Sequence, residues 1–133
     1  MKKIFLFLFL FLFSCSQPDE CPELIFDSST KISTTLDGDP YTGRCMVYNE
    51  YGGESIQQYL NGVDYGKWVF YFPDGQIRTK GTFNEYGKRV GKWRYYHENG
   101  MKKQISIYST DGERIGKWIE YDSAGEIINE INY

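Results

Sequence analysis

The chain contains few of the residues from which catalytic and metal sites are built. Its 133 residues include a single histidine, His97, and three cysteines, none of which belongs to a Cys-x-x-Cys pair. His97 falls in a stretch typical of a turn, no nucleophile motif accompanies it, and no glycine string matches a phosphate-binding loop. The acidic residues are spread along the chain without a recognisable pair. Catalysis, a bound metal ion and a cofactor are therefore not expected.

A basic excess is also missing. The chain has 15 lysines and arginines against 18 aspartates and glutamates, which gives a formal net charge of −3. No run of lysine and arginine supplies the clustered positive charge that binding to a phosphate backbone requires. We therefore do not expect nucleic acid as a partner.

Long apolar runs are absent except at the N-terminus. Ile4–Phe13 is an unbroken run of ten apolar residues behind two lysines, which is too short to span a bilayer and is typical of an export signal. The run ends in Leu12-Phe13-Ser14-Cys15, which resembles the bacterial lipobox. This resemblance implies a signal peptide over residues 1–14 and a lipoprotein whose diacylglyceryl, palmitate-bearing Cys15 inserts into the bacterial outer membrane. The alternative is an ordinary secretory signal with a chance cysteine.

The residues that follow Cys15 bear on where the anchored protein would be displayed. Ser16-Gln17-Pro18-Asp19-Glu20 is similar to the surface-export signals of bacterial lipoproteins, which implies exposure on the cell surface. A plain solvated tether is the alternative reading of this acidic string. Removal of residues 1–14 takes away two lysines and leaves a net charge of about −5.

What the chain does have is repetition. Four segments share the frame glycine, cation, tryptophan or cysteine, two variable residues, tyrosine: Gly43–Tyr48, Gly66–Tyr71, Gly91–Tyr96 and Gly116–Tyr121. The last three are spaced by 25 residues, and the first begins 23 residues before the second. Such a period indicates stacked supersecondary units.

Each unit reads as a β-hairpin. A second glycine follows each leading glycine by nine residues, and strings such as Pro73-Asp74-Gly75 and Ser123-Ala124-Gly125 are typical of a type I turn followed by a left-handed glycine. Second strands are predicted over residues 76–83, 101–108 and 126–133. The expected fold is all-β, an elongated antiparallel ribbon of about four hairpins over residues 41–133. Residues 15–40 are expected to form the lipidated tether and an N-terminal cap, with short strands at 24–26 and 32–36.

Two cysteines remain once Cys15 is acylated. When the four repeats are aligned, Cys45 falls in the column where the other repeats carry tryptophan, and Cys21 lies in the segment before the first repeat. Because an exported protein meets an oxidising compartment, we predict a disulfide between them. Two buried free thiols are the alternative.

The frame Gly-Lys-Trp-x-x-Tyr-x-x-x-Gly, opened in the first copy by Asp37-Gly38-Asp39-Pro40-Tyr41-Thr42-Gly43, resembles the bacterial variant of the membrane occupation and recognition nexus (MORN) repeat over about residues 37–133. This resemblance implies a ladder of β-hairpins, and some bacterial relatives are labelled antitoxin components. A weaker likeness is to aromatic cell-wall-binding repeats, which also combine Trp, Tyr-Tyr and Gly.

Stacked repeats turn each sequence column into a row of side chains. The tryptophan row is expected to be structural because each ring can bury up to about 250 Å², and it comprises Trp68, Trp93 and Trp118. The tyrosine row is either packed or an exposed binding surface: Tyr48, Tyr71, Tyr96 and Tyr121. The cationic row is either a ligand site or neutralised by Asp64, Asp74 and Glu113, and consists of Arg44, Lys67, Lys92 and Lys117. Since side chains alternate along a strand, tryptophan is expected to face away from lysine and tyrosine.

These rows support several non-catalytic functions. The first is a lipid-anchored module that mediates protein–protein interaction through a ribbon face or through its last strand. That strand ends the chain without a polar terminal repeat, so edge-strand self-association is also considered, with Glu126 and Glu130 as residues that would oppose it. The alternatives are a glycan-binding surface lipoprotein that stacks sugars on exposed aromatics, and an antitoxin-like or immunity-like partner protein. The sequence names no ligand.

Overall fold

The computed structural model describes residues 18–48 and 52–133, and all regular structure within these ranges is β-strand. The predicted lipidation site, Cys15, and the predicted signal peptide lie outside the described residues. The strands are β1 (Leu24–Asp27), β2 (Ile32–Thr35), β3 (Gly43–Tyr48), β4 (Glu54–Leu60), β5 (Val63–Asp64), β6 (Gly66–Tyr71), β7 (Ile77–Phe83), β8 (Arg89–Tyr96), β9 (Lys102–Tyr108), β10 (Lys117–Tyr121) and β11 (Ile127–Asn132).

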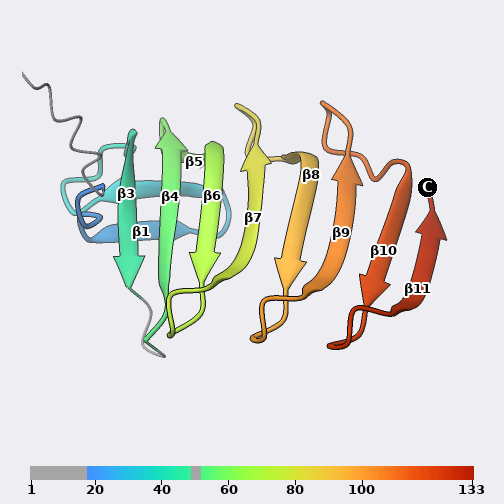
Figure 1. Ribbon diagram of the computed structural model, residues 1–133. Coiled ribbons are helices and arrows are strands. Elements are labelled where there is room, and N and C mark those ends of the chain that lie inside the picture. The colour runs from blue at the N-terminus through green and yellow to red at the C-terminus, as the bar shows by residue number, and fades with distance from the viewer. Residues whose placement is uncertain (1–17, 49–51) are drawn as a thin grey trace, which may run out of the picture.

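The main sheet is an open antiparallel ribbon. Its strands follow one another in the order β11-β10-β9-β8-β7-β6-β4-β3, with the short β5 paired to β4. Figure 1 shows this row of neighbouring hairpins. The prediction of an all-β ribbon with one hairpin per repeat is confirmed. Because the strands of the main sheet follow their order in the sequence, with only the short β5 off this path, the order of the repeats along the chain is also their order in space.

The hairpin turns explain the second glycine of each repeat. In the turn between β6 and β7, the Phe72 amide donates to the Gln76 carbonyl at 2.8 Å and the Gly75 amide donates to the Phe72 carbonyl at 2.9 Å. Gly75 has a φ of 83°, and the equivalent Gly100 and Gly125 have φ values of 79° and 90°. Side chains rarely adopt this left-handed region, so glycine ends each turn.

The tryptophans bond each repeat to the one before it. The indole N–H groups of Trp68, Trp93 and Trp118 donate to the backbone carbonyls of Gln58, Thr82 and Ile107, at 2.9, 3.2 and 3.0 Å respectively. Each acceptor lies on the second strand of the preceding hairpin. The indole therefore joins the repeats through a hydrogen bond that is independent of the strand ladder.

Aromatic rings from the second strands fill the spaces beside these indoles. The Phe83 ring lies edge-on between Trp68 and Trp93, with ring centres 5.1 and 5.0 Å apart. In the last repeat Trp118 lies between Tyr108 and Tyr133 in the same way. Edge-to-face packing of this kind is favourable beyond the area it buries. We call the sheet face that carries the tryptophans the aromatic face.

The N-terminal segment closes the first end of the sheet in two ways. The β1–β2 hairpin crosses behind β3, β4 and β6 (Figure 1), where Leu24 packs against the cluster of Cys45, Tyr59 and Trp68. The outer edge of β3 is covered instead by residues 19–21, because the Met46 amide donates to the Asp19 carbonyl and the Cys21 amide donates to the Met46 carbonyl, both at 2.8 Å. The two predicted short strands thus cover a face, and an unpredicted segment covers the edge.

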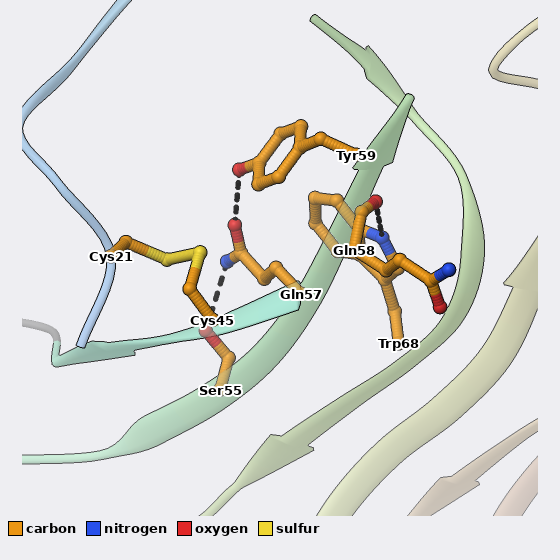
Figure 2. The surroundings of a disulfide bond; sticks show 7 residues. All are labelled: Cys21, Cys45, Ser55, Gln57, Gln58, Tyr59 and Trp68. Carbon is orange, nitrogen blue, oxygen red and sulfur yellow. Dashed lines mark hydrogen bonds between the residues drawn. A yellow bond between two sulfur atoms is a disulfide. The ribbon is translucent and has the colours of Figure 1, made fainter. Parts of the chain in front are cut away.

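A disulfide joins Cys21 to Cys45, with their Cα atoms 4.7 Å apart (Figure 2). Cys45 is only 1% exposed. Beside it, the Tyr59 hydroxyl donates to the Gln57 side chain, whose amide group donates to the Ser55 hydroxyl at 2.9 Å. Burial, and to a lesser extent the Asp64 carboxylate, raises the pKa of Tyr59 to about 12. The phenol therefore stays protonated and remains a donor at any physiological pH.

The disulfide is expected to stabilise the N-terminal end by restricting the unfolded chain. For a sequence separation of 24 residues, the loop-closure effect is about 3.5 kcal/mol. We expect the Cys21→Ala/Cys45→Ala double variant to lose about this much free energy of unfolding in a urea titration. Reduction of the wild-type protein should reproduce the loss. Alkylation of both cysteines in unreduced, denatured protein would contradict the bridge.

Gly81 is expected to be required for the packing of the Trp93 ring against β7. A Cβ atom at this position would lie 2.1 Å from two atoms of the Trp93 ring, and that ring is 1% exposed. Gly81→Ala should therefore lower the free energy of unfolding by roughly 1–3 kcal/mol through overpacking. In a Trp93→Leu background the same change should cost clearly less, because the clash is removed. Equal costs in the two backgrounds would contradict this explanation.

Candidate functional site

The face opposite the aromatic face carries the predicted lysine and tyrosine rows. Within each first strand the side chains alternate, so Lys67 and Tyr71 point away from Trp68, and the strand register keeps equivalent residues of the other repeats on the same sides. We call this surface the lysine face. It carries both candidate binding rows: Lys67, Lys92 and Lys117, and Tyr48, Tyr71, Tyr96 and Tyr121.

The tyrosine row is partly accessible. Tyr48 is 56% exposed, whereas Tyr71, Tyr96 and Tyr121 are half-buried. Tyr96 and Tyr121 line a shallow hollow of about 320 Å³ together with Met101. The tyrosines therefore contribute both to packing between repeats and to the surface that a ligand would meet.

One lysine of the row, Lys117, forms an ion pair. Among residues 18–48 and 52–133, the one ion pair within 4.0 Å joins the Lys117 Nζ to a Glu130 carboxylate oxygen at 2.9 Å. None of the alternative partners Asp64, Asp74 and Glu113 forms an ion pair within 4.0 Å with a lysine of the row. Asp64 pairs with Tyr59 across β5 and β4, where burial raises the pKa of its carboxyl group. Asp74 instead accepts hydrogen bonds from Gln76 within its own turn.

The tryptophan row offers little surface to a ligand. Trp93 is 1% exposed and Trp68 is 8% exposed. The guanidinium groups of Arg89 and Arg114 lie over the rings of Trp93 and Trp118, at 4.6 and 5.0 Å from the ring centres, which adds cation–π attraction. Sequence reasoning missed this arginine pair, although its 25-residue spacing is the same as that of the tryptophans.

Sequence reasoning also missed two cations on the lysine face, Lys80 and Arg94. Both line a shallow hollow with Lys67 and Lys92. They escaped notice because they do not recur: the residues one and two repeats after Lys80 are Ile105 and Glu130. Alignment of the repeats identifies only residues that recur at the same position in each copy.

The two edges of the main sheet differ. Residues 19–21 cover β3, but β11 is an outermost strand. The Tyr133 amide donates inward to the Gly116 carbonyl at 2.9 Å, and Ile131 and Asn129 pair with Trp118 and Glu120 on β10. By alternation, the amide and carbonyl groups of Glu130 and Asn132 point outward, whereas a shift in register interrupts the alternation at Ile128. We call this outward side of β11 the free edge.

Apolar side chains accompany the free edge. Ile127, Ile128 and Ile131 are 54%, 65% and 42% exposed. An edge that combines unpaired backbone groups with exposed β-branched side chains is a template for another strand. The arrangement can therefore bind an extended peptide segment through main-chain hydrogen bonds.

His97 contacts the next repeat. Its Nε2 atom lies 3.0 Å from the Tyr121 carbonyl of the next repeat. In the part of the chain that the structure describes, no three His, Cys, Asp or Glu side chains form a group that could hold a metal ion. Over the same residues, no helix has the length and apolar character needed to cross a membrane.

Comparison with known proteins identifies the repeats. Among curated proteins, none matches the chain. One solved structure, the crystal structure of the GtfA/B complex bound to UDP and GlcNAc, is similar with 12% sequence identity and a TM-score of 0.32; the match covers 91% of this chain and 29% of that chain. Residues 64–85, 89–109 and 114–133 each match the family described as the MORN repeat variant. These matches follow the hairpins β6–β7, β8–β9 and β10–β11. With the short gaps between them they extend over residues 64–133, just over half of the sequence, so the chain belongs to the MORN repeat variant family.

Proposed function

We propose that this chain is a lipid-anchored, non-catalytic module of the bacterial outer membrane that binds another protein through the free edge. The single observation that carries the proposal is the asymmetry of the sheet. One edge is covered by residues 19–21, with two backbone hydrogen bonds to Met46, whereas the other edge ends in β11 with its outward backbone groups uncovered by any described strand. Proteins usually cover or blunt such an edge, so a long bare one suits strand addition.

The position of the proposed anchor suits this function. Cys15 precedes Cys21 by six residues, and Cys21 is bonded to β3 at the covered end of the sheet. Seven strand spacings of about 4.8 Å separate β3 from β11, or roughly 34 Å. A lipid on Cys15 would therefore hold the covered end near the membrane and leave the free edge at the far end of the ribbon.

The favoured occupant of the free edge is an extended segment of a different protein. In a symmetric antiparallel pairing of two copies centred on Glu130, this residue would lie directly opposite its counterpart. Like charges opposite each other are destabilising, and Glu126 adds a further negative charge beside the strand. A partner segment with apolar residues to meet the exposed isoleucines and a basic residue to meet Glu130 fits better.

The proposed anchor is tested by labelling. Cys15→Ala should abolish incorporation of labelled palmitate and release the protein from the outer-membrane fraction, because the variant has no thiol to acylate at that position. The Cys21→Ala/Cys45→Ala double variant is the matched control and should keep the label. Labelling of the Cys15 variant would show that the lipid is attached elsewhere or that no lipobox is used.

The proposed edge contact is tested by a proline at Glu130. The Glu130 amide points outward, so Glu130→Pro removes a donor that a partner strand needs without removing a bond to β10. A photo-crosslinking residue at Asn132 of the full chain should give a cross-linked product of defined mass in intact cells. We expect Glu130→Pro to reduce its yield at least about tenfold, since the loss of register removes several edge hydrogen bonds.

Glu130→Ala is the matched control, because both variants lose the ion pair with Lys117 but only proline lacks the amide N–H. The alanine variant should keep most of the cross-link, because it loses one side-chain contact with the partner but no backbone hydrogen bond of the edge. Equal yields from the alanine and proline variants would refute strand addition. A cross-linked product with the mass of two copies of this chain would show that the free edge mediates self-association and does not bind a different protein.

A further inference from the structure

A shallow hollow of about 220 Å³ lies on the lysine face over β6, β7 and β8. We call it the basic hollow, because four of the side chains that line it are cationic: Lys67, Lys80, Lys92 and Arg94. Val69 forms part of its apolar floor, and Thr82 adds a hydroxyl group. A chain with a net charge of −3 thus gathers four positive charges at one place on one face.

The strand register brings these charges together. Lys80 on β7 lies directly opposite Arg94 on β8, and it also lies opposite Val69 on β6, two residues after Lys67. Lys92 precedes Arg94 by two residues and therefore points to the same side of the sheet. Like charges directly opposite one another in neighbouring strands repel. The isolated protein therefore carries an unfavourable electrostatic arrangement at this point.

The last repeat shows how the same fold relieves such an arrangement. Lys117 is the counterpart of Lys67, and Glu130 is the counterpart of Lys80, since both pairs are separated by two repeats of 25 residues. Lys117 and Glu130 form an ion pair at 2.9 Å. In the last repeat, the residue diagonally across from the lysine is therefore an acid, Glu130, which neutralises Lys117. In the basic hollow, the equivalent residue is a further cation, Lys80, which lies diagonally across from Lys67. Across the described ranges, 18–48 and 52–133, no ion pair includes any of its four cations.

The chemistry of the lining selects the ligand. Two lysine ammonium groups can approach one anion from several directions, and a guanidinium group offers a planar pair of donors that matches the oxygens of a phosphate. A single carboxylate would neutralise one of four positive charges, whereas a phosphate monoester or a diphosphate carries two or more negative charges. The hollow is also shallow and small, which suits one charged group at the surface.

We propose that the basic hollow is a binding site for a multiply charged phosphate group, carried either by a soluble phosphate compound or by a lipid headgroup. The site is separate from the free edge of β11, and the two proposals stand or fall independently. The bound phosphate group neutralises the cations of the basic hollow, as Glu130 neutralises Lys117 in the last repeat. Binding should weaken as salt is added, because mobile ions screen exposed charges.

Calorimetric titration of the full chain in a non-ionic detergent tests the site with three probes. Inorganic pyrophosphate represents the soluble source, dihexanoyl phosphatidic acid represents the headgroup source, and dihexanoyl phosphatidylcholine is the zwitterionic control. We expect binding of pyrophosphate, of phosphatidic acid, or of both, and none of phosphatidylcholine. A response to phosphatidic acid alone would assign the site to a headgroup, and a response to pyrophosphate alone would assign it to a soluble compound.

Lys80→Glu is the decisive variant. It recreates in the basic hollow the diagonal pair seen between Lys117 and Glu130, so the variant should fold with an unchanged or higher melting temperature and bind the probes at least about tenfold more weakly. Lys88→Glu makes the same change in net charge outside the hollow and should leave binding unchanged. Absence of binding to both phosphate probes, or equal weakening by the two variants, would overturn the proposal.

Discussion

The hydrogen bond from each tryptophan indole to a carbonyl of the preceding hairpin is the contact on which the ribbon depends. A strand ladder alone would tie neighbouring hairpins only along their backbones, and β9 and β10 share just two directly paired positions, at Ile105 and Gln104. The Trp118 bond to Ile107 reinforces this short seam. Because the indole also packs between rings of two second strands, one side chain fixes the register, spacing and orientation of two repeats.

The first repeat lacks this side chain, and the N-terminal end is built differently as a result. Cys45 is too small to reach another hairpin, so the space beside it is filled from the sequence before the repeats. The disulfide to Cys21, the β1–β2 hairpin across the face and the backbone bonds of Asp19 and Cys21 to Met46 replace the missing neighbour. One end of the sheet is therefore covered by its own chain, whereas none of the described strands covers β11 at the other end.

Features that recur in every copy could be predicted from the sequence, and features that occur once could not. The 25-residue spacing predicted the hairpins, their turns and the separation of tryptophan from lysine and tyrosine, because the same residues meet the same neighbours in each repeat. The disulfide could be predicted as well, because Cys45 replaces a tryptophan of the frame and an exported chain meets an oxidising compartment. The pairing of residues 19–21 with β3 could not be predicted, because it depends on the edge of the sheet at the first repeat, which has no counterpart in the other repeats. The cluster around Lys80 could not be predicted either, because it depends on contacts between neighbouring strands, which an alignment of the repeats does not show.

The ribbon therefore contains two kinds of position: those that hold the repeats together and those that vary from repeat to repeat. Columns that hold the repeats together are restricted to glycine, tryptophan and tyrosine, since a change in one copy would disturb two hairpins. The column that contains Lys80, Ile105 and Glu130 has no such restriction, and its charge changes from positive to neutral to negative along the sheet. Because the strand pairing at these positions is equivalent in each repeat, their side chains can change without altering the hairpin. Recognition by this ribbon is therefore expected to depend on the columns that vary, with the repeated frame supplying the spacing.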